Sequence, residues 1–230
     1  MFRLLRFLLA VALLPFAWAM TLVCGDVFRQ MSTTGAGFFS SEGLAVLAGV
    51  LGFLLVWMFL PAPVRVYVLG HELTHALWGI LFGARVGNLK VGLRGGSVTL
   101  TKSNFLITLA PYFFPFYTVL VVLVALVTRI FVAPLPCSWA WLFAVGFTWC
   151  LHACFTIQSL LQTQPDIQEC GHLFSYVLIW TLNVAGVVLW ILCTTEVSFA
   201  AAGHSLWTQT HDVYLFLFNE SVRAFSLLRR

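Results

Sequence analysis

Residues 64–83 read VRVYVLGHELTHALWGILFG, an apolar segment that contains an H-E-x-x-H pattern. His71 and His75 are four residues apart, so a helix places both imidazoles on the same face. Glu72 lies one step round that helix, where its carboxylate can reach a water molecule on the same metal ion. The pattern predicts two ligands of one zinc ion and a general base; the alternative is a chance match in a helix that contains histidines.

The composition of the whole chain is far from that of a soluble domain. Of its 230 residues, 61% are hydrophobic and 9% are charged, and the mean hydropathy is +0.97. We therefore expect an integral, multi-pass membrane protein whose first partner is the lipid bilayer; the sequence leaves open which membrane holds it. The net charge of +4 is spread over loops and chain ends, as for membrane-flanking anchors, so we expect no nucleic-acid partner.

The hydropathy pattern predicts about six transmembrane helices in an all-α polytopic protein. They are expected at residues 5–23, 43–60, 64–83, 105–131, 139–162 and 173–195, each near the roughly 20 residues that cross a bilayer. Residues 1–22 have features of a signal peptide, but we expect an uncleaved span because the apolar run continues to Val23. One membrane-embedded domain over residues 1–230 is predicted, with its core at 64–195 and a possible interfacial helix at 205–228.

A short β-hairpin is predicted directly after the zinc-binding helix. Apolar and polar residues alternate between Val86 and Ser103, and Gly95-Gly96 interrupts the alternation. Such a hairpin could offer an unpaired edge to which an extended substrate segment adds as another strand, or it could be a plain surface hairpin. In the following segment, Pro111 and Pro115 predict a kink near its beginning.

Polar residues recur at helical spacing within the predicted span at 139–162. This stripe consists of Thr148, His152, Thr156, Ser159 and Gln162. Inside a membrane such a stripe is expected to face the bundle interior or a water-filled cavity. We expect His152 to contact the substrate or transition state as a hydrogen-bond donor, and a buried structural histidine is the alternative.

A catalytic zinc ion commonly has three protein ligands and an open fourth position, so one ligand is still needed. Asp166 is the leading candidate because it follows the polar stripe and the helix-breaking Pro165. Glu169 would share a helix face with Asp166, and His152 or His172 could bind through a ring nitrogen. These three residues remain alternative ligands.

The segment at residues 68–77, followed by Gly83 and a hairpin, resembles the site-2 protease family of intramembrane zinc metalloproteases. The likeness is to the compact branch, which has no soluble regulatory domain. A late aspartate completes the site in that family, so the resemblance implies Asp166 as the third ligand. The family usually has asparagine-proline before this aspartate, whereas this chain has Gln164-Pro165-Asp166.

The resemblance implies a zinc metalloendopeptidase with Glu72 as the catalytic base and with His71, His75 and Asp166 as the ligands of one Zn²⁺. Its substrate would be a transmembrane or juxtamembrane segment of another membrane protein, which must unwind locally to expose the scissile carbonyl. Two other functions compete with this hypothesis. They are a non-hydrolytic membrane metal-binding protein, such as a transporter or sensor, and an inactive protease-like scaffold.

Overall fold

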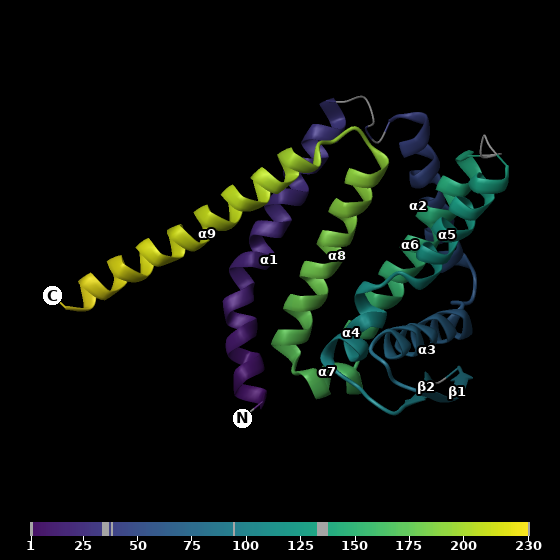
Figure 1. The fold of residues 1–230 in the computed structure, drawn as a ribbon, viewed down its shortest axis with the longest axis horizontal. Coiled ribbons are helices and arrows are strands. Elements are labelled where there is room, and N and C mark those ends of the chain that lie inside the picture. Colours follow the sequence, from purple (N-terminus) through teal and green to yellow (C-terminus); the bar gives the residue numbers. More distant parts are fainter. Residues whose placement is uncertain (1, 34–36, 38, 94, 133–137, 230) are drawn as a thin grey trace. The chain divides into compact units, whose positions relative to one another are not determined.

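A computed structural model describes residues 2–33, 37, 39–93, 95–132 and 138–229 of the chain (Figure 1). The helices are α1 Phe2–Thr33, α2 Ser41–Phe59, α3 Val64–Leu81, α4 Phe105–Phe113, α5 Phe116–Phe131, α6 Ser138–Leu160, α7 Pro165–Cys170, α8 His172–Thr194 and α9 Phe199–Leu228. The two strands are β1 Val86–Gly92 and β2 Gly95–Leu100. The chain forms two compact units: a central unit of residues 38–169, and a terminal unit of residues 1–37 and 170–230.

Several of these helices are long and apolar enough to cross a membrane. Within the described residues they are α1, α2, α6 and α8, and the bent pair α4 and α5 makes a fifth candidate. This set is compatible with a multi-pass membrane protein, but the predicted count of six spans is not confirmed. The helix α3, predicted as the third span, is not in this set, because the polar side chains of its H-E-x-x-H pattern lower its hydropathy.

The predicted kink at the start of the segment 105–131 is confirmed. The axes of α4 and α5 differ in direction by 75°, and the break lies between Phe113 and Phe116. Pro115 is the residue that precedes α5, and its ring excludes the helical amide hydrogen bond that would continue α4 through this point. A second proline, Pro111, lies inside α4.

In the central unit, α2 and α6 approach each other at two glycines. A Cβ atom at Gly49 would collide with the carbonyl oxygen of Phe143, and one at Gly146 would collide with the carbonyl oxygen of Val46. Close approach at small residues is a common way for membrane helices to pack, since lipid gives little hydrophobic drive to association. Apolar side chains, among them the fully buried Phe53, fill the neighbouring space between these helices.

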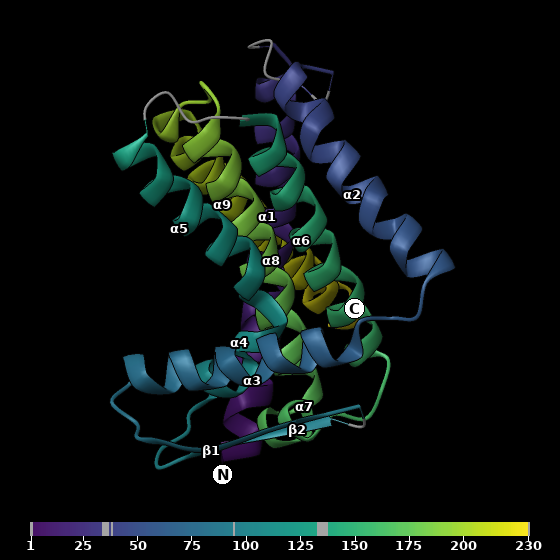
Figure 2. The ribbon, with the colours of Figure 1, turned by 90° about the vertical axis from the view of Figure 1, so that its right-hand side faces the viewer.

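The hairpin lies alongside α3, and α3 runs crosswise to α6 (Figure 2). Strands β1 and β2 are antiparallel, with Leu89 opposite Val98 and Gly92 opposite Gly95. The predicted hairpin is therefore confirmed, and the two glycines that interrupt the alternation, Gly95 and Gly96, belong to β2. Gly83, with φ of 74°, allows the sharp exit from α3 towards β1.

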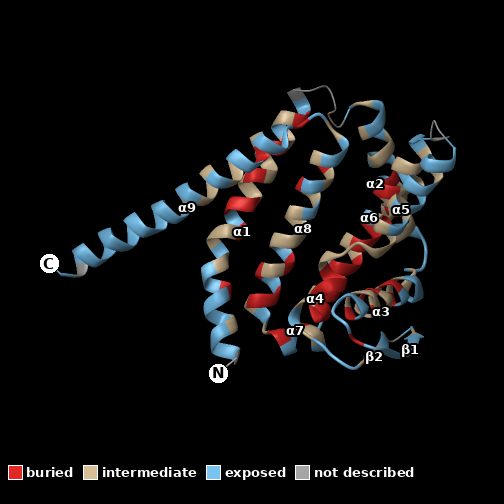
Figure 3. Cartoon of the chain, in the orientation of Figure 1, coloured by how far each residue is buried: buried red, intermediate tan, exposed pale blue. Residues whose placement is uncertain are grey.

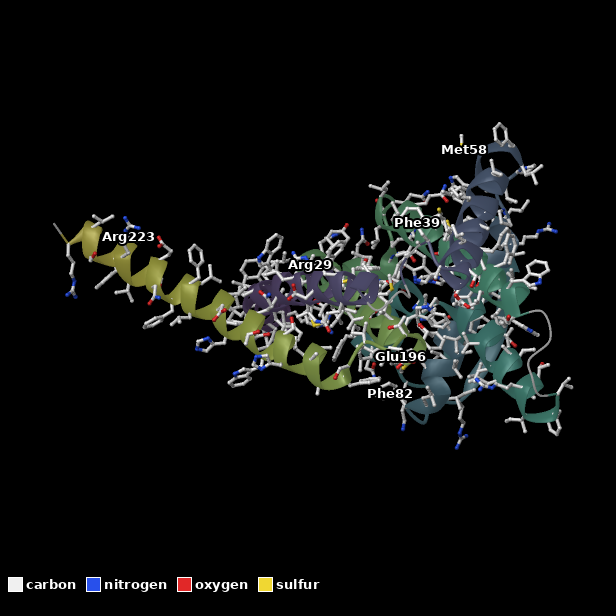
Figure 4. All side chains as sticks on the ribbon, turned by 90° about the horizontal axis from the view of Figure 1, so that it is seen from above. Arg29, Phe39, Met58, Phe82, Glu196 and Arg223 are labelled. Carbon is white, nitrogen blue, oxygen red and sulfur yellow. The ribbon has the colours of Figure 1, made fainter. Side chains whose placement is uncertain are left out.

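In the terminal unit, α1 packs against α8 and α9. Its buried apolar core consists of Val23, Val27, Met31, Val188, Ile191, Val197 and Ala202. Asp26 also ties α9 to α1, since its carboxylate accepts hydrogen bonds from Ser205 and Gln209. Beyond Tyr214 the described side chains of α9 are exposed (Figure 3), and Arg223 projects from this part of the helix (Figure 4). The possible interfacial segment 205–228 lies within this helix.

Replacing Gly146 by alanine is expected to lower the free energy of unfolding by about 1–3 kcal/mol, because the new methyl group forces α2 away from α6. Denaturant titration in mixed micelles measures this change. The matched control is Gly186→Ala in α8, where an added Cβ meets no atom within 4 Å. That variant should be neutral or stabilised by up to about 1 kcal/mol, since alanine favours helix. Equal effects of the two substitutions would contradict close backbone packing at Gly146.

Candidate metal centre

Three side chains from two helices of the central unit converge at one point. The Nε2 atoms of His71 and His75 are 3.2 Å apart, and each lies 3.5 Å from Oδ2 of Asp166. The histidines lie one turn apart on α3, whereas the aspartate lies in the short helix α7, after the end of α6. The structure thus brings together the two predicted histidine ligands and the leading candidate for the third ligand.

The spacing of these three atoms fits a zinc ion. Tetrahedral zinc has bonds of about 2.0–2.2 Å to nitrogen and oxygen, which separates neighbouring ligand atoms by about 3.3–3.5 Å. The measured separations of 3.2–3.5 Å agree with this value. Two imidazoles and one carboxylate are also a usual donor set for catalytic zinc, in which a fourth position stays open. The group can therefore hold a metal ion without rearrangement of its backbone.

His75 is oriented by a backbone carbonyl of α4. Its Nδ1 atom lies 2.9 Å from the carbonyl oxygen of Ile107, which can only accept a hydrogen bond. The ring therefore carries a proton on Nδ1, and Nε2 is the nitrogen that faces Asp166 and His71. This is the tautomer that a metal ligand at Nε2 requires.

His71 is oriented by a pair of hydroxyl groups. Its Nδ1 atom lies 3.3 Å from the hydroxyl of Tyr67, and that hydroxyl is 2.7 Å from Oγ of Ser159. The ring of Tyr67 is itself stacked on Phe155 at a centroid distance of 4.4 Å. These contacts connect the face of α3 that bears the two histidines to α6 and limit rotation of the His71 ring.

The hydroxyl of Tyr112 orients Asp166. It donates a hydrogen bond of 3.0 Å to Oδ2, and the tyrosine is fully buried with its ring edge-on to His71. Burial raises the pKa of the Asp166 carboxyl, but its hydrogen bonds with His71 and His75 outweigh this effect. The pKa therefore lies well below the usual value of an aspartate, and the side chain is an ionised carboxylate at neutral pH.

Glu72 lies beside the hairpin, on the same helix as the two histidines. It is 6% exposed, and a Cβ atom added at Gly96 would lie 2.7 Å from its Cγ atom. Only a glycine lets β2 approach the carboxylate this closely. The site therefore combines the group of three ligand atoms with the buried carboxylate of Glu72, which lies against strand β2.

The remaining predicted site residues lie outside the ligand group. His152 is 8% exposed and lies on α6, where Thr156 and Ser159 of the polar stripe are also buried. Glu169 is exposed on α7, three residues after Asp166. His172 begins α8 in the terminal unit. A role of His152 towards a substrate stays a prediction.

Three residues that orient the ligands were not predicted from the sequence. The hydroxyl of Tyr67 could have been found, because this residue lies four positions before His71 on the same helix face. Tyr112 and the carbonyl of Ile107 have no comparable local pattern, since their contacts join segments far apart in the sequence.

No protein-family model, curated protein or solved structure matches this chain. The likeness to the site-2 protease family therefore stays a prediction from residues 68–77 and Asp166. The chemistry of the three ligand atoms and of Glu72 is the basis on which a function can be inferred.

Purified wild-type protein in detergent is expected to hold close to one zinc ion per chain, and His71→Ala and Asp166→Ala are expected to lose it. Metal content by plasma mass spectrometry after identical purification measures this. Glu169→Ala is the matched control for Asp166→Ala, because it removes an exposed carboxylate from the same short helix. Zinc that persists without Asp166 and disappears without Glu169 would contradict the assignment.

Tyr112→Phe is expected to raise the zinc dissociation constant about tenfold or more, because the Asp166 carboxylate loses the donor that orients it. Competition with a chelator of known affinity measures the constant. Tyr117→Phe is the matched control, since the Tyr117 hydroxyl donates to the carbonyl of Val66 and touches no ligand of the group. The assigned role of Tyr112 is wrong if the two variants bind zinc equally well.

Proposed function

We propose that this protein is an intramembrane zinc metalloprotease that hydrolyses peptide bonds in or next to transmembrane segments. The observation that carries the proposal is the convergence of His71, His75 and Asp166 beside the carboxylate of Glu72. Two histidine ligands and a third carboxylate ligand, with a glutamate next to the first histidine, are the parts that metal-assisted peptide hydrolysis needs.

Each residue has a defined task in this reaction. Zinc held by the three ligands would act as a Lewis acid and lower the pKa of a bound water towards ~7. Glu72 accepts a proton from the attacking water and then gives it to the leaving amine, so that the amine departs as a neutral group. His71, His75 and Asp166 keep their positions through the reaction because each has its own hydrogen-bond partner outside the group.

The apolar setting of the site supports a membrane-embedded substrate. The central unit contains α2, α6 and the α4–α5 pair, which are candidate membrane spans. A transmembrane substrate would have to unwind at the scissile bond, because helical hydrogen bonds protect its carbonyl groups. An unwound segment could add to the hairpin as a further strand, and the approach of Gly96 to Glu72 brings that hairpin next to the catalytic carboxylate.

The position of Glu72 favours hydrolysis over metal transport or sensing. A transport site needs ligands that exchange along a path, whereas the ligand group within the described residues is a single set of three. Glu72 is not one of these three, yet it is buried on the same helix. A buried carboxylate beside a metal group has a clear use as a base, and a metal-storing or scaffold protein has no need of it.

Glu72→Gln is expected to keep its zinc and to lower the rate of peptide cleavage by about 100-fold or more, because the amide cannot accept the proton. Cleavage of single-span model proteins, each with a helix-weakening Gly-Pro or Asn-Pro pair in its transmembrane segment, measures the rate in detergent micelles. Glu42→Gln, which changes an exposed glutamate at the start of α2, is the matched control and should retain full activity.

Three outcomes would count against the proposal. Glu72→Gln that cleaves as fast as the wild type would remove Glu72 from the mechanism. A wild type that binds zinc and cleaves none of the model substrates would favour the non-hydrolytic metal-binding protein. An absence of zinc in the wild type would leave the inactive scaffold.

A further inference from the structure

Helix α4 contains a proline whose position determines where one carbonyl group can bond. In an α-helix the carbonyl of residue i accepts the amide hydrogen of residue i+4. The residue four positions after Ile107 is Pro111, which has no amide hydrogen. The carbonyl of Ile107 is therefore deprived of the donor that a regular helix would supply.

The freed carbonyl is directed to the metal centre. Ile107 is fully buried, so water cannot replace the missing donor. The carbonyl oxygen instead lies 2.9 Å from Nδ1 of His75. A buried backbone carbonyl needs a partner, and the ring N–H of His75 provides it. Pro111 thus leaves the Ile107 carbonyl without its helical amide donor, and His75 supplies a ring N–H in place of that donor.

We propose that Pro111 is a positioning residue of the metal centre, which reserves the Ile107 carbonyl for His75 and thereby sets the tautomer and orientation of that ligand. This inference rests on the proposed metal centre, although it does not depend on the reaction that the centre performs. Any residue other than proline at position 111 would bring a second donor to the same oxygen, and the shared oxygen would bind and direct the His75 ring less strongly.

Bending of the chain does not account for Pro111. The 75° break between α4 and α5 lies between Phe113 and Phe116, where Pro115 precedes the new helix. Pro111 lies before this break, within a turn of α4 that is buried on all sides. Proline is the least favourable residue in a helix interior, so its place here needs a cause other than the break.

The same turn of α4 supports a second ligand. Tyr112, the residue after Pro111, donates its hydroxyl hydrogen to Oδ2 of Asp166. Two of the three ligands are thus oriented from one buried helix, by the carbonyl of Ile107 and by the hydroxyl of Tyr112. A change in the path of α4 at residue 111 would be transmitted to both of them.

Pro111→Ala tests this role. It is expected to weaken zinc binding without lowering the stability of the zinc-free protein. The dissociation constant for zinc, measured by chelator competition on the full chain in detergent, should rise about 10–100-fold. The midpoint of thermal unfolding of the zinc-free protein should stay the same or rise, because alanine favours helix. Pro15→Ala is the matched control: it changes the proline inside α1 and should leave zinc affinity unaltered.

The tautomer of His75 gives a second, independent measurement. Nitrogen-15 spectra of the zinc-free wild type, with His75 assigned by comparison with His75→Gln, should show the proton on Nδ1. The signal should move towards a mixture of tautomers in Pro111→Ala. A wild-type spectrum without a proton on Nδ1 would overturn the inference even if the proline variant failed to fold.

Three further outcomes distinguish a failure of the Pro111 role from a failure of the metal centre. Wild-type zinc affinity in Pro111→Ala, with an unchanged tautomer, would overturn the role of Pro111 and leave the metal centre intact. A fall in affinity that Pro15→Ala reproduces would also overturn it. A wild type that binds no zinc would overturn both the proposed metal centre and this inference.

Discussion

The central unit depends on holding three electron-pair donors against one another. His71 Nε2, His75 Nε2 and Asp166 Oδ2 lie within 3.2–3.5 Å, although atoms that carry lone pairs repel unless a proton or a metal cation lies between them. Such a group stays together only when the surrounding structure fixes each member. The packing of α3, α4, α6 and α7 holds the three atoms in these positions.

Each ligand is fixed by a different kind of partner. A backbone carbonyl holds His75, a pair of hydroxyls holds His71, and a buried phenol holds Asp166. All of these partners come from α3, α4 or α6. The packing of those helices therefore determines the geometry of the ligand group. In an apolar environment a ligand without its partner would leave a buried polar atom unsatisfied, which is costly, and the outer contacts therefore stabilise the helices as well.

Local patterns in the sequence were sufficient for much of the architecture. Apolar runs predicted the candidate spans α1, α2, α6 and α8, and alternation predicted the hairpin. Pro111 and Pro115 together predicted the bend, which the structure places at Pro115. Hydropathy over the observed helix did not identify α3, the predicted third span, as a candidate span, since the polar side chains of its H-E-x-x-H pattern make it less apolar than a lipid-facing helix. Gly95 and Gly96, which interrupt the alternation, both belong to β2, and the structure adds that Gly96 permits the close approach to Glu72.

By itself the sequence determined that His71 and His75 share a helix face and that Glu72 lies beside them, because a helical period acts over four residues and needs no other part of the chain. It narrowed the third ligand to a few acidic and histidine side chains, with Asp166 foremost. Only the tertiary structure separated Asp166 from Glu169, which lies on the same short helix, and only it brought Tyr112 and the carbonyl of Ile107 to the ligands. The reason is physical: these contacts join segments far apart in the chain, and their positions are decided by how helices pack and not by the periodicity of any one helix.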